Sequence, residues 1–149
     1  MKDFLDDSDA ALQLVKLLDE EFDCVVAVLP NAVKIAITVS TQLDTPILEW
    51  WSESQVRVPD QFSKLLIVDD GVETGRKAAF IAEELGDGID KCLAVPVCSR
   101  EIESGLAPLY RKIYAVKRPF VRRSLDWHYE VRPEYSATEA RLLLDSALD

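Results

Sequence analysis

Two adjacent carboxylates, Asp69 and Asp70, follow an apolar run and begin a short glycine-containing loop. The run Leu65–Val68 before them has the composition of a buried strand, and the loop from Gly71 to Gly75 leads into a helical pattern. Acids at the carboxyl end of a strand suit the hydroxyls of a sugar, whereas backbone amides at the start of a helix suit a phosphate. The segment therefore predicts a binding site for a sugar phosphate.

Strand and helix patterns alternate along the rest of the chain. Apolar runs predict five strands, near residues 24–29, 46–51, 64–68, 92–97 and 113–116. Helices are predicted from Asp7 or Ser8, with Leu12, Val15, Leu18 and Phe22 on the apolar face, then over 33–43, 76–85 and 99–110. A last helix follows Ser136, which has capping-box spacing to Glu139.

Residues 33–43 carry features of both a helix and a strand. Their β-branched side chains favour a strand. The length of the run, and the Asp44-Thr45-Pro46 sequence that ends it, favour a buried helix. On these two features we predict the helix.

Strands separated by helices predict an α/β fold with a doubly wound, mostly parallel five-stranded sheet. In the common strand order 2-1-3-4-5, ligands bind at the switch point between the first and third strands. The loops at residues 29–33 and 69–75 meet there, so the acidic segment lies where such a sheet binds its ligand. A length of 149 residues predicts a single domain over residues 1–149.

Composition excludes several classes of partner and location. A formal net charge of -10 argues against nucleic acid and anionic membranes as partners. No run approaches the roughly 20 apolar residues that cross a bilayer, and the acidic N-terminal segment is unlike a signal peptide. The three cysteines are odd in number and predict buried free thiols of a reducing compartment, so we expect a cytoplasmic protein. The apolar content and surplus tryptophan are compatible with a homodimer.

The segment Leu66–Gly75 resembles the phosphoribosyl pyrophosphate (PRPP) signature of the type I phosphoribosyltransferases. It shares the apolar run, the paired acids, the spacing and the Thr-Gly ending. The resemblance extends over most of the chain. Leu29-Pro30 resembles the start of the pyrophosphate loop, 94–97 the next core strand, and 127–130 the aromatic hood of uncharacterised bacterial members. A small C-terminal hood is therefore expected at about residues 119–135.

The resemblance implies a role for each matching residue. Asp69 and Asp70 would contact the ribose hydroxyls as the catalytic acids and would touch Mg²⁺ through water. The 5'-phosphate would be wrapped by the loop, that is by Gly71, Val72, Glu73, Thr74 and Gly75, with Arg76 as an adjacent cation. The remaining substrate contacts would come from Pro30, Asn31 and Ala32 in the pyrophosphate loop and from Trp127 in the hood.

Two departures from the pattern lie on the side of the leaving pyrophosphate. The loop Asn31-Ala32-Val33-Lys34 lacks the glycine pair and the arginine of related members, and Lys34 is its one cation. The segment available as a mobile lid, residues 52–63, is short and has Arg57 as its one cation. Three functions are therefore considered. The first is a phosphoribosyltransferase whose acceptor the sequence does not identify. The others are a non-catalytic sensor of phosphoribosyl ligands and an interaction protein with an empty site.

The acidic segment and His128 also have simpler interpretations. Asp69-Asp70-Gly71 is also the composition of a plain solvated turn. A response-regulator receiver also ends a strand in paired acids. Here, however, the pair follows the third strand, and Cys98-Ser99 stands where that class carries its phosphorylated aspartate. The lone His128 is expected at the surface or in the hood and not as a general base.

Overall fold

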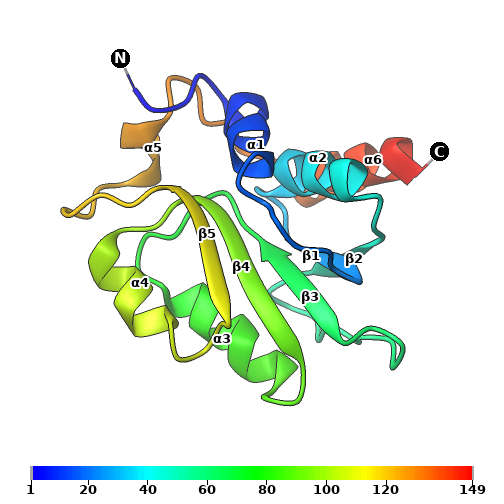
Figure 1. The fold of residues 1–149 in the computed structure, drawn as a ribbon. Helices are drawn as coiled ribbons and strands as arrows, with labels where there is room; N and C mark the ends of the chain where they lie inside the picture. The colour runs from blue at the N-terminus through cyan, green and yellow to red at the C-terminus, as the bar shows by residue number, and fades with distance from the viewer. Residues whose placement is uncertain (1, 149) are drawn as a thin grey trace.

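A five-stranded sheet with helices on both faces forms the body of the molecule (Figure 1). The computed structural model describes the backbone of residues 2–148 and the side chains of residues 2–147. Its strands are β1 Cys24–Val28, β2 Ile47–Trp50, β3 Lys64–Val68, β4 Asp90–Val97 and β5 Lys112–Lys117. Their order is β2-β1-β3-β4-β5 and every neighbouring pair is parallel. The predicted α/β class and strand order are therefore confirmed.

The described residues contain six helices: α1 Asp7–Val15, α2 Val33–Leu43, α3 Arg76–Leu85, α4 Arg100–Leu106, α5 Leu125–His128 and α6 Ala137–Leu148. The helices α3 and α4 cover one face of the sheet, and α1, α2 and α6 cover the other (Figure 1). The ambiguous segment 33–43 is a helix, as predicted. The capping box is also present, because the Glu139 amide donates to Ser136 Oγ and the Ser136 amide donates to Glu139 Oε1.

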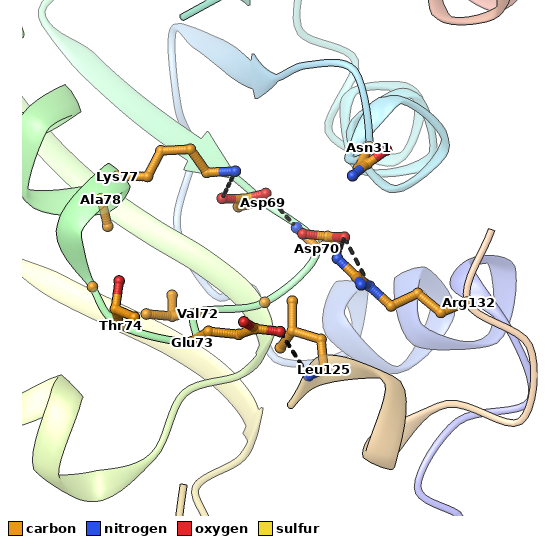
Figure 2. Close-up of a pocket in the computed structure, with 12 residues that line it drawn as sticks. Asn31, Asp69, Asp70, Val72, Glu73, Thr74, Lys77, Ala78, Leu125 and Arg132 are labelled. Carbon is orange, nitrogen blue, oxygen red and sulfur yellow. Dashed lines mark hydrogen bonds and ion pairs between the residues drawn. The ribbon is translucent and has the colours of Figure 1, made fainter. Parts of the chain in front are cut away.

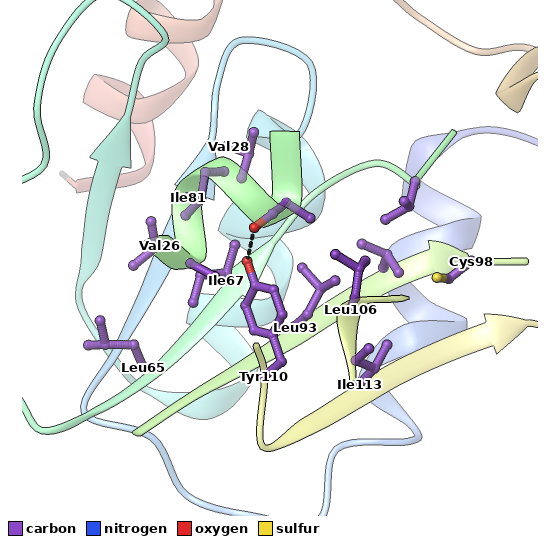
Figure 3. Close-up of a cluster of buried hydrophobic side chains, with 14 of the residues drawn as sticks. Val26, Val28, Leu65, Ile67, Ile81, Leu93, Cys98, Leu106, Tyr110 and Ile113 are labelled. Carbon is purple, nitrogen blue, oxygen red and sulfur yellow. Dashed lines mark hydrogen bonds between the residues drawn. The ribbon is translucent and has the colours of Figure 1, made fainter. Parts of the chain in front are cut away.

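The interior strand β1, which lies between β2 and β3, is buried on both faces. Val26 and Val28 pack in the cluster under α3 and α4 (Figure 3), whereas Ala27 packs in the cluster under α1 and α2. A strand covered on both faces has no polar side, which explains its continuous apolar run. In the first cluster the Tyr110 hydroxyl donates to the Ala78 carbonyl oxygen at 2.7 Å, and this bond fixes the first turns of α3 against the sheet.

Some local predictions were wrong. The first helix is capped by Asp6 and ends at Val15, and its buried face consists of Asp7, Ala10, Ala11 and Leu14. Leu12 is 55% exposed instead, because two alanines form the close contact with the core. The helix after Ser99 ends at Leu106, short of Tyr110, and the hood segment contains a short helix, α5.

Two further expectations concern burial. Cys24, Cys92 and Cys98 are buried free thiols, as predicted, and burial raises the pKa of Cys98 to about 11. His128 lies in the predicted hood segment, one of the two places expected for it, but its side chain is buried there and only 1% exposed. Among the described residues, none of the helices combines the length and apolar character needed to span a bilayer.

Candidate functional site

A cavity of about 320 Å³ opens where β1 and β3 end, at the switch point of the sheet. Figure 2 shows the side chains around it, which come from four places in the sequence. The lining consists of Asn31, Asp69, Asp70, Gly71, Val72, Glu73, Thr74, Gly75, Lys77, Ala78, Leu125 and Arg132. The parallel sheet therefore brings the acidic loop to the position predicted for a ligand.

The two acids lie side by side and are almost fully buried. The Asp70 amide donates to Asp69 Oδ1 at 2.8 Å, and Lys77 Nζ lies 3.4 Å from Asp69 Oδ2. Burial raises the pKa of Asp69 well above its ordinary value of 3.8, and the neighbouring charge of Asp70 raises it further. Two carboxylates this close and this buried repel each other when both are charged. Hydrogen-bond donors of a ligand, such as hydroxyl groups, would reduce that repulsion.

The second acid is held by the segment around α5. Arg132 donates to Asp70 Oδ2 through Nη2 at 2.9 Å and through Nε at 3.3 Å. The buried Tyr129 hydroxyl donates to the Asp70 carbonyl oxygen at 3.0 Å. The third guanidinium nitrogen of Arg132, Nη1, lies 3.3 Å from Asp126 Oδ1. The segment thus fixes both the backbone and the carboxylate of Asp70.

The loop after the acids has the geometry of an anion cradle. Gly71 and Gly75 have φ of 146° and 85°, in the region that favours glycine, and Gly75 is the N-cap of α3 without a capping side chain. The Arg76 amide makes a 3.3 Å contact with Thr74 Oγ1. A Cβ on Gly75 would lie 2.9 Å from Ile102 Cγ2, so α4 packs closely behind the loop. The amides at the start of α3, with the positive end of its dipole, border the cavity.

The hood segment, residues 119–135, clamps both loops of the site. The Leu125 amide donates to Glu73 Oε1 at 3.0 Å, and Arg122 Nη1 donates to the Glu73 carbonyl oxygen at 3.3 Å. On the other side of the cavity, the Tyr135 amide donates to Asn31 Oδ1 at 3.1 Å. These bonds connect the hood to the acidic loop and to the β1–α2 loop at once.

The structure gathers most of the predicted site residues and leaves four outside the lining. Asn31 and the continuous run from Asp69 to Gly75 surround one cavity. Pro30 and Ala32 lie beside Asn31 but do not line it, and Arg76 lines a neighbouring hollow between α3 and α4. Trp127 is 49% exposed on α5, and the Arg123 guanidinium lies 4.6 Å from its ring centroid.

Sequence reasoning missed four residues of the lining, Lys77, Ala78, Leu125 and Arg132, and two of them bring positive charge to the acids. Lys77 adjoins the predicted loop, and its helical position was a usable signal. Arg132 is 62 positions from Asp70, and nothing in the local sequence predicts that contact.

The cations considered from sequence do not reach the cavity. Lys34 is exposed on α2. Arg57 belongs to the segment 52–63, whose side chains Val56, Val58 and Phe62 pack against the core cluster under α3. The Val56 amide also donates to Glu84 Oε1 at 3.1 Å, so this segment is docked on α3 and does not cover the site.

His128 is also occupied elsewhere. Its Nδ1 lies 2.7 Å from Asp3 Oδ2, and its buried Nε2 has no partner among the described residues. The ring ties the N-terminal segment to α5 and does not line the cavity.

Two carboxylates alone do not make a complete metal site, so the acid pair would hold a metal ion only together with a bound ligand. No group of three or more Asp, Glu, His or Cys side chains in the described part of the chain is arranged to hold a metal. Mg²⁺ commonly uses one or two carboxylates and completes its shell with substrate phosphates and water. Asp69 and Asp70 supply two carboxylates for that role, and Mg²⁺ would compete there with Lys77 for Asp69 and with Arg132 for Asp70.

Comparison with known proteins places the fold in a class. No family model matches the sequence, and no curated protein resembles it closely enough to match. The structure is similar to TT1426 from Thermus thermophilus, with a TM-score of 0.75 at 17% identity over 97% of this chain and 98% of that one. It is also similar to the orotate phosphoribosyltransferase of Aeropyrum pernix, with a TM-score of 0.58 at 23% identity over 73% and 68% of the two chains.

A third similar structure is the purine phosphoribosyltransferase of Pyrococcus horikoshii, with a TM-score of 0.54 at 18% identity over 88% of this chain and 91% of that one. These likenesses show the fold of the type I phosphoribosyltransferases. The resemblance inferred from the acidic loop is therefore confirmed at the level of the fold.

Proposed function

We propose that this protein binds a phosphoribosyl ligand in the cavity and transfers the phosphoribosyl group of PRPP to a nitrogenous base. One observation carries the proposal: the buried acid pair and the glycine loop at the start of α3 border the same cavity. A ligand that satisfies both must carry hydroxyl donors and an anion at opposite ends. Ribose 5-phosphate is the smallest common unit with that chemistry.

The ligand contacts follow from the charges on each side. The ribose hydroxyls donate to Asp69 and Asp70, and this offsets the repulsion that raises the pKa of Asp69. The 5'-phosphate accepts hydrogen bonds from the loop amides and from the Thr74 hydroxyl, near the positive end of the α3 dipole. The Glu73 carboxylate accepts a hydrogen bond from the Leu125 amide, and this bond partly offsets its charge beside the phosphate.

In the transfer, the bond between the anomeric carbon and the diphosphate oxygen breaks, and the diphosphate leaves with the electron pair. A ring nitrogen of the base forms the new bond and releases its proton to solvent. Asp69 and Asp70 would hold a Mg²⁺ ion that enters with the ligand, and the ion would supply positive charge to the diphosphate as it leaves. The chain's own residues position the ribose: the acids hold the hydroxyls, the loop holds the 5'-phosphate, and the hood excludes water from one side.

A non-catalytic sensor of phosphoribosyl ligands is the second candidate. Two observations favour it: the segment 52–63 is docked on α3 and does not cover the cavity, and Asn31 is held by the Tyr135 amide. A protein of this kind would bind ribose 5-phosphate and PRPP without turning PRPP over.

Two measurements test these proposals together. Titration calorimetry with ribose 5-phosphate, and with PRPP plus Mg²⁺, is expected to show saturable one-site binding of both. Incubation of PRPP with a panel of purine and pyrimidine bases is then expected to release pyrophosphate. Binding without release with any base would favour the sensor, and binding of neither ligand would contradict both proposals and leave an interaction protein.

A further inference from the structure

Among the described residues, two cationic side chains line the cavity, Lys77 and Arg132. They lie on opposite sides of the acid pair, Lys77 next to Asp69 and Arg132 next to Asp70 (Figure 2). Any second anionic group of a ligand would meet the two buried carboxylates as well, and like charges at such distances repel strongly. Besides a Mg²⁺ ion that enters with the ligand, these two side chains are the cations at the cavity that could offset this repulsion.

One nitrogen of the Arg132 guanidinium, Nη1, is only weakly engaged. Its Nε and Nη2 are directed to Asp70 Oδ2, whereas Nη1 contacts Asp126 Oδ1 at 3.3 Å. The Asp126 carboxylate is 72% exposed, and an ion pair with so exposed a partner contributes little free energy. Guanidinium carries five N–H donors in a fixed plane. The Nη1 edge can exchange Asp126 for a ligand oxygen while the other edge stays on Asp70.

Lys77 is less suited to that task. Its side chain is 52% exposed, and its ammonium group is a mobile point charge 3.4 Å from Asp69 Oδ2. Arg132 is 16% exposed, and Tyr129 and Asp70 hold its surroundings in place. A planar donor group that is already fixed loses little entropy when it binds an anion.

We propose that Arg132 binds the diphosphate at the anomeric carbon of the ligand and thereby makes the site selective for PRPP over ribose 5-phosphate. The inference rests on the proposed binding of a phosphoribosyl ligand. It assigns to the hood the cation that the loop Asn31-Ala32-Val33-Lys34 does not bring into the cavity. Arg132 would then connect the ribose-binding acid to the leaving group through one side chain.

The test compares Arg132→Gln with wild type for two probes, PRPP with Mg²⁺ and ribose 5-phosphate, by titration calorimetry. The variant is expected to weaken PRPP binding by about tenfold or more, since an interaction with a charged group is lost. Ribose 5-phosphate has no diphosphate, so its affinity is expected to change by less than about threefold. Arg141→Gln removes an exposed arginine on α6 and serves as the control of equal charge, with neither affinity altered.

Other outcomes overturn the inference. Equal weakening of both probes would mean that Arg132 acts through Asp70 on the ribose alone. Tighter binding of both probes would mean that Arg132 competes with the ligand for the acid pair. A wild-type protein that binds both probes equally would overturn the selectivity but not the phosphoribosyl site, whereas one that binds neither would overturn the proposed function itself.

A second variant keeps the test decisive if Arg132→Gln does not fold. Asp126→Asn removes the carboxylate that competes for Nη1 and leaves Arg132 intact. It is expected to tighten PRPP binding by about twofold to threefold and to leave ribose 5-phosphate unchanged. An equal effect on both probes, or no effect on PRPP, would contradict the assignment of Nη1 to the diphosphate.

Discussion

Leu125 of α5 packs directly on Gly71 of the acidic loop, so closely that a Cβ on Gly71 would lie 2.5 Å from Leu125 Cδ2. The backbone of Gly71 also has φ of 146°, a conformation that side chains disfavour. The hood and the acidic loop therefore share one close contact at a position that favours glycine.

Gly71→Ala is expected to lower the free energy of unfolding by about 1–3 kcal/mol, from backbone strain together with overpacking. Urea unfolding measures the change. In a Leu125→Ala background the overpacking disappears and the strain remains, so the same substitution should cost less there. An equal cost in both backgrounds would show that the contact with Leu125 does not matter.

Replacing both acids is expected to reduce ligand binding far more than replacing the cation of the segment 52–63. Asp69→Asn with Asp70→Asn should weaken ribose 5-phosphate binding by about tenfold or more, because charged acceptors of the ribose hydroxyls are lost. Arg57→Ala should have an effect below about twofold, since its segment is docked on α3 away from the cavity. Calorimetry decides the order, and the reverse order would overturn the placement of the ribose.

Asp69→Asn alone is expected to stabilise the unliganded protein at pH 7, by about 1 kcal/mol. The pKa of Asp69 is raised in the folded state by burial and by Asp70, so its ionisation opposes folding above that raised pKa. As the pH falls through the raised pKa toward the ordinary value of 3.8, wild-type Asp69 gains its proton and the advantage of the variant should shrink. Thermal unfolding between pH 7 and pH 4 follows the difference. A constant difference over this range would show that Asp69 does not titrate there.

Gly75→Val is expected to abolish binding of ribose 5-phosphate. The backbone has φ of 85° and a Cβ would lie 2.9 Å from Ile102 Cγ2, so a branched side chain must displace the loop from the start of α3. The matched control is Gly88→Val, where a Cβ would meet nothing within 4 Å. Circular dichroism checks that both variants fold. Unaltered affinity in a folded Gly75→Val protein would contradict the assignment of the loop to the phosphate.

Local sequence was sufficient where a single physical constraint acts on neighbouring residues. The apolar run of β1 predicts burial on both faces, the Ser136–Glu139 spacing predicts a cap, and Gly75 before a helical pattern predicts the start of α3. The α1 face was less predictable, since Ala10 and Ala11 carry too little hydrophobicity to mark a contact that depends on close approach.

The sequence by itself determined the α/β class, the position of the acidic loop at the switch point and the chemistry of its paired acids. These depend on the period of apolar residues and on the order of strands, which the chain carries locally. Only the tertiary structure decided that Arg132 and Leu125 complete the site, that the segment 52–63 is docked away from it, and that His128 is buried. Contacts between segments many positions apart depend on how elements pack in space, and side-chain spacing along the chain does not encode that packing. Asp69 and Asp70 were therefore predicted from sequence, whereas the cation that holds Asp70 was not.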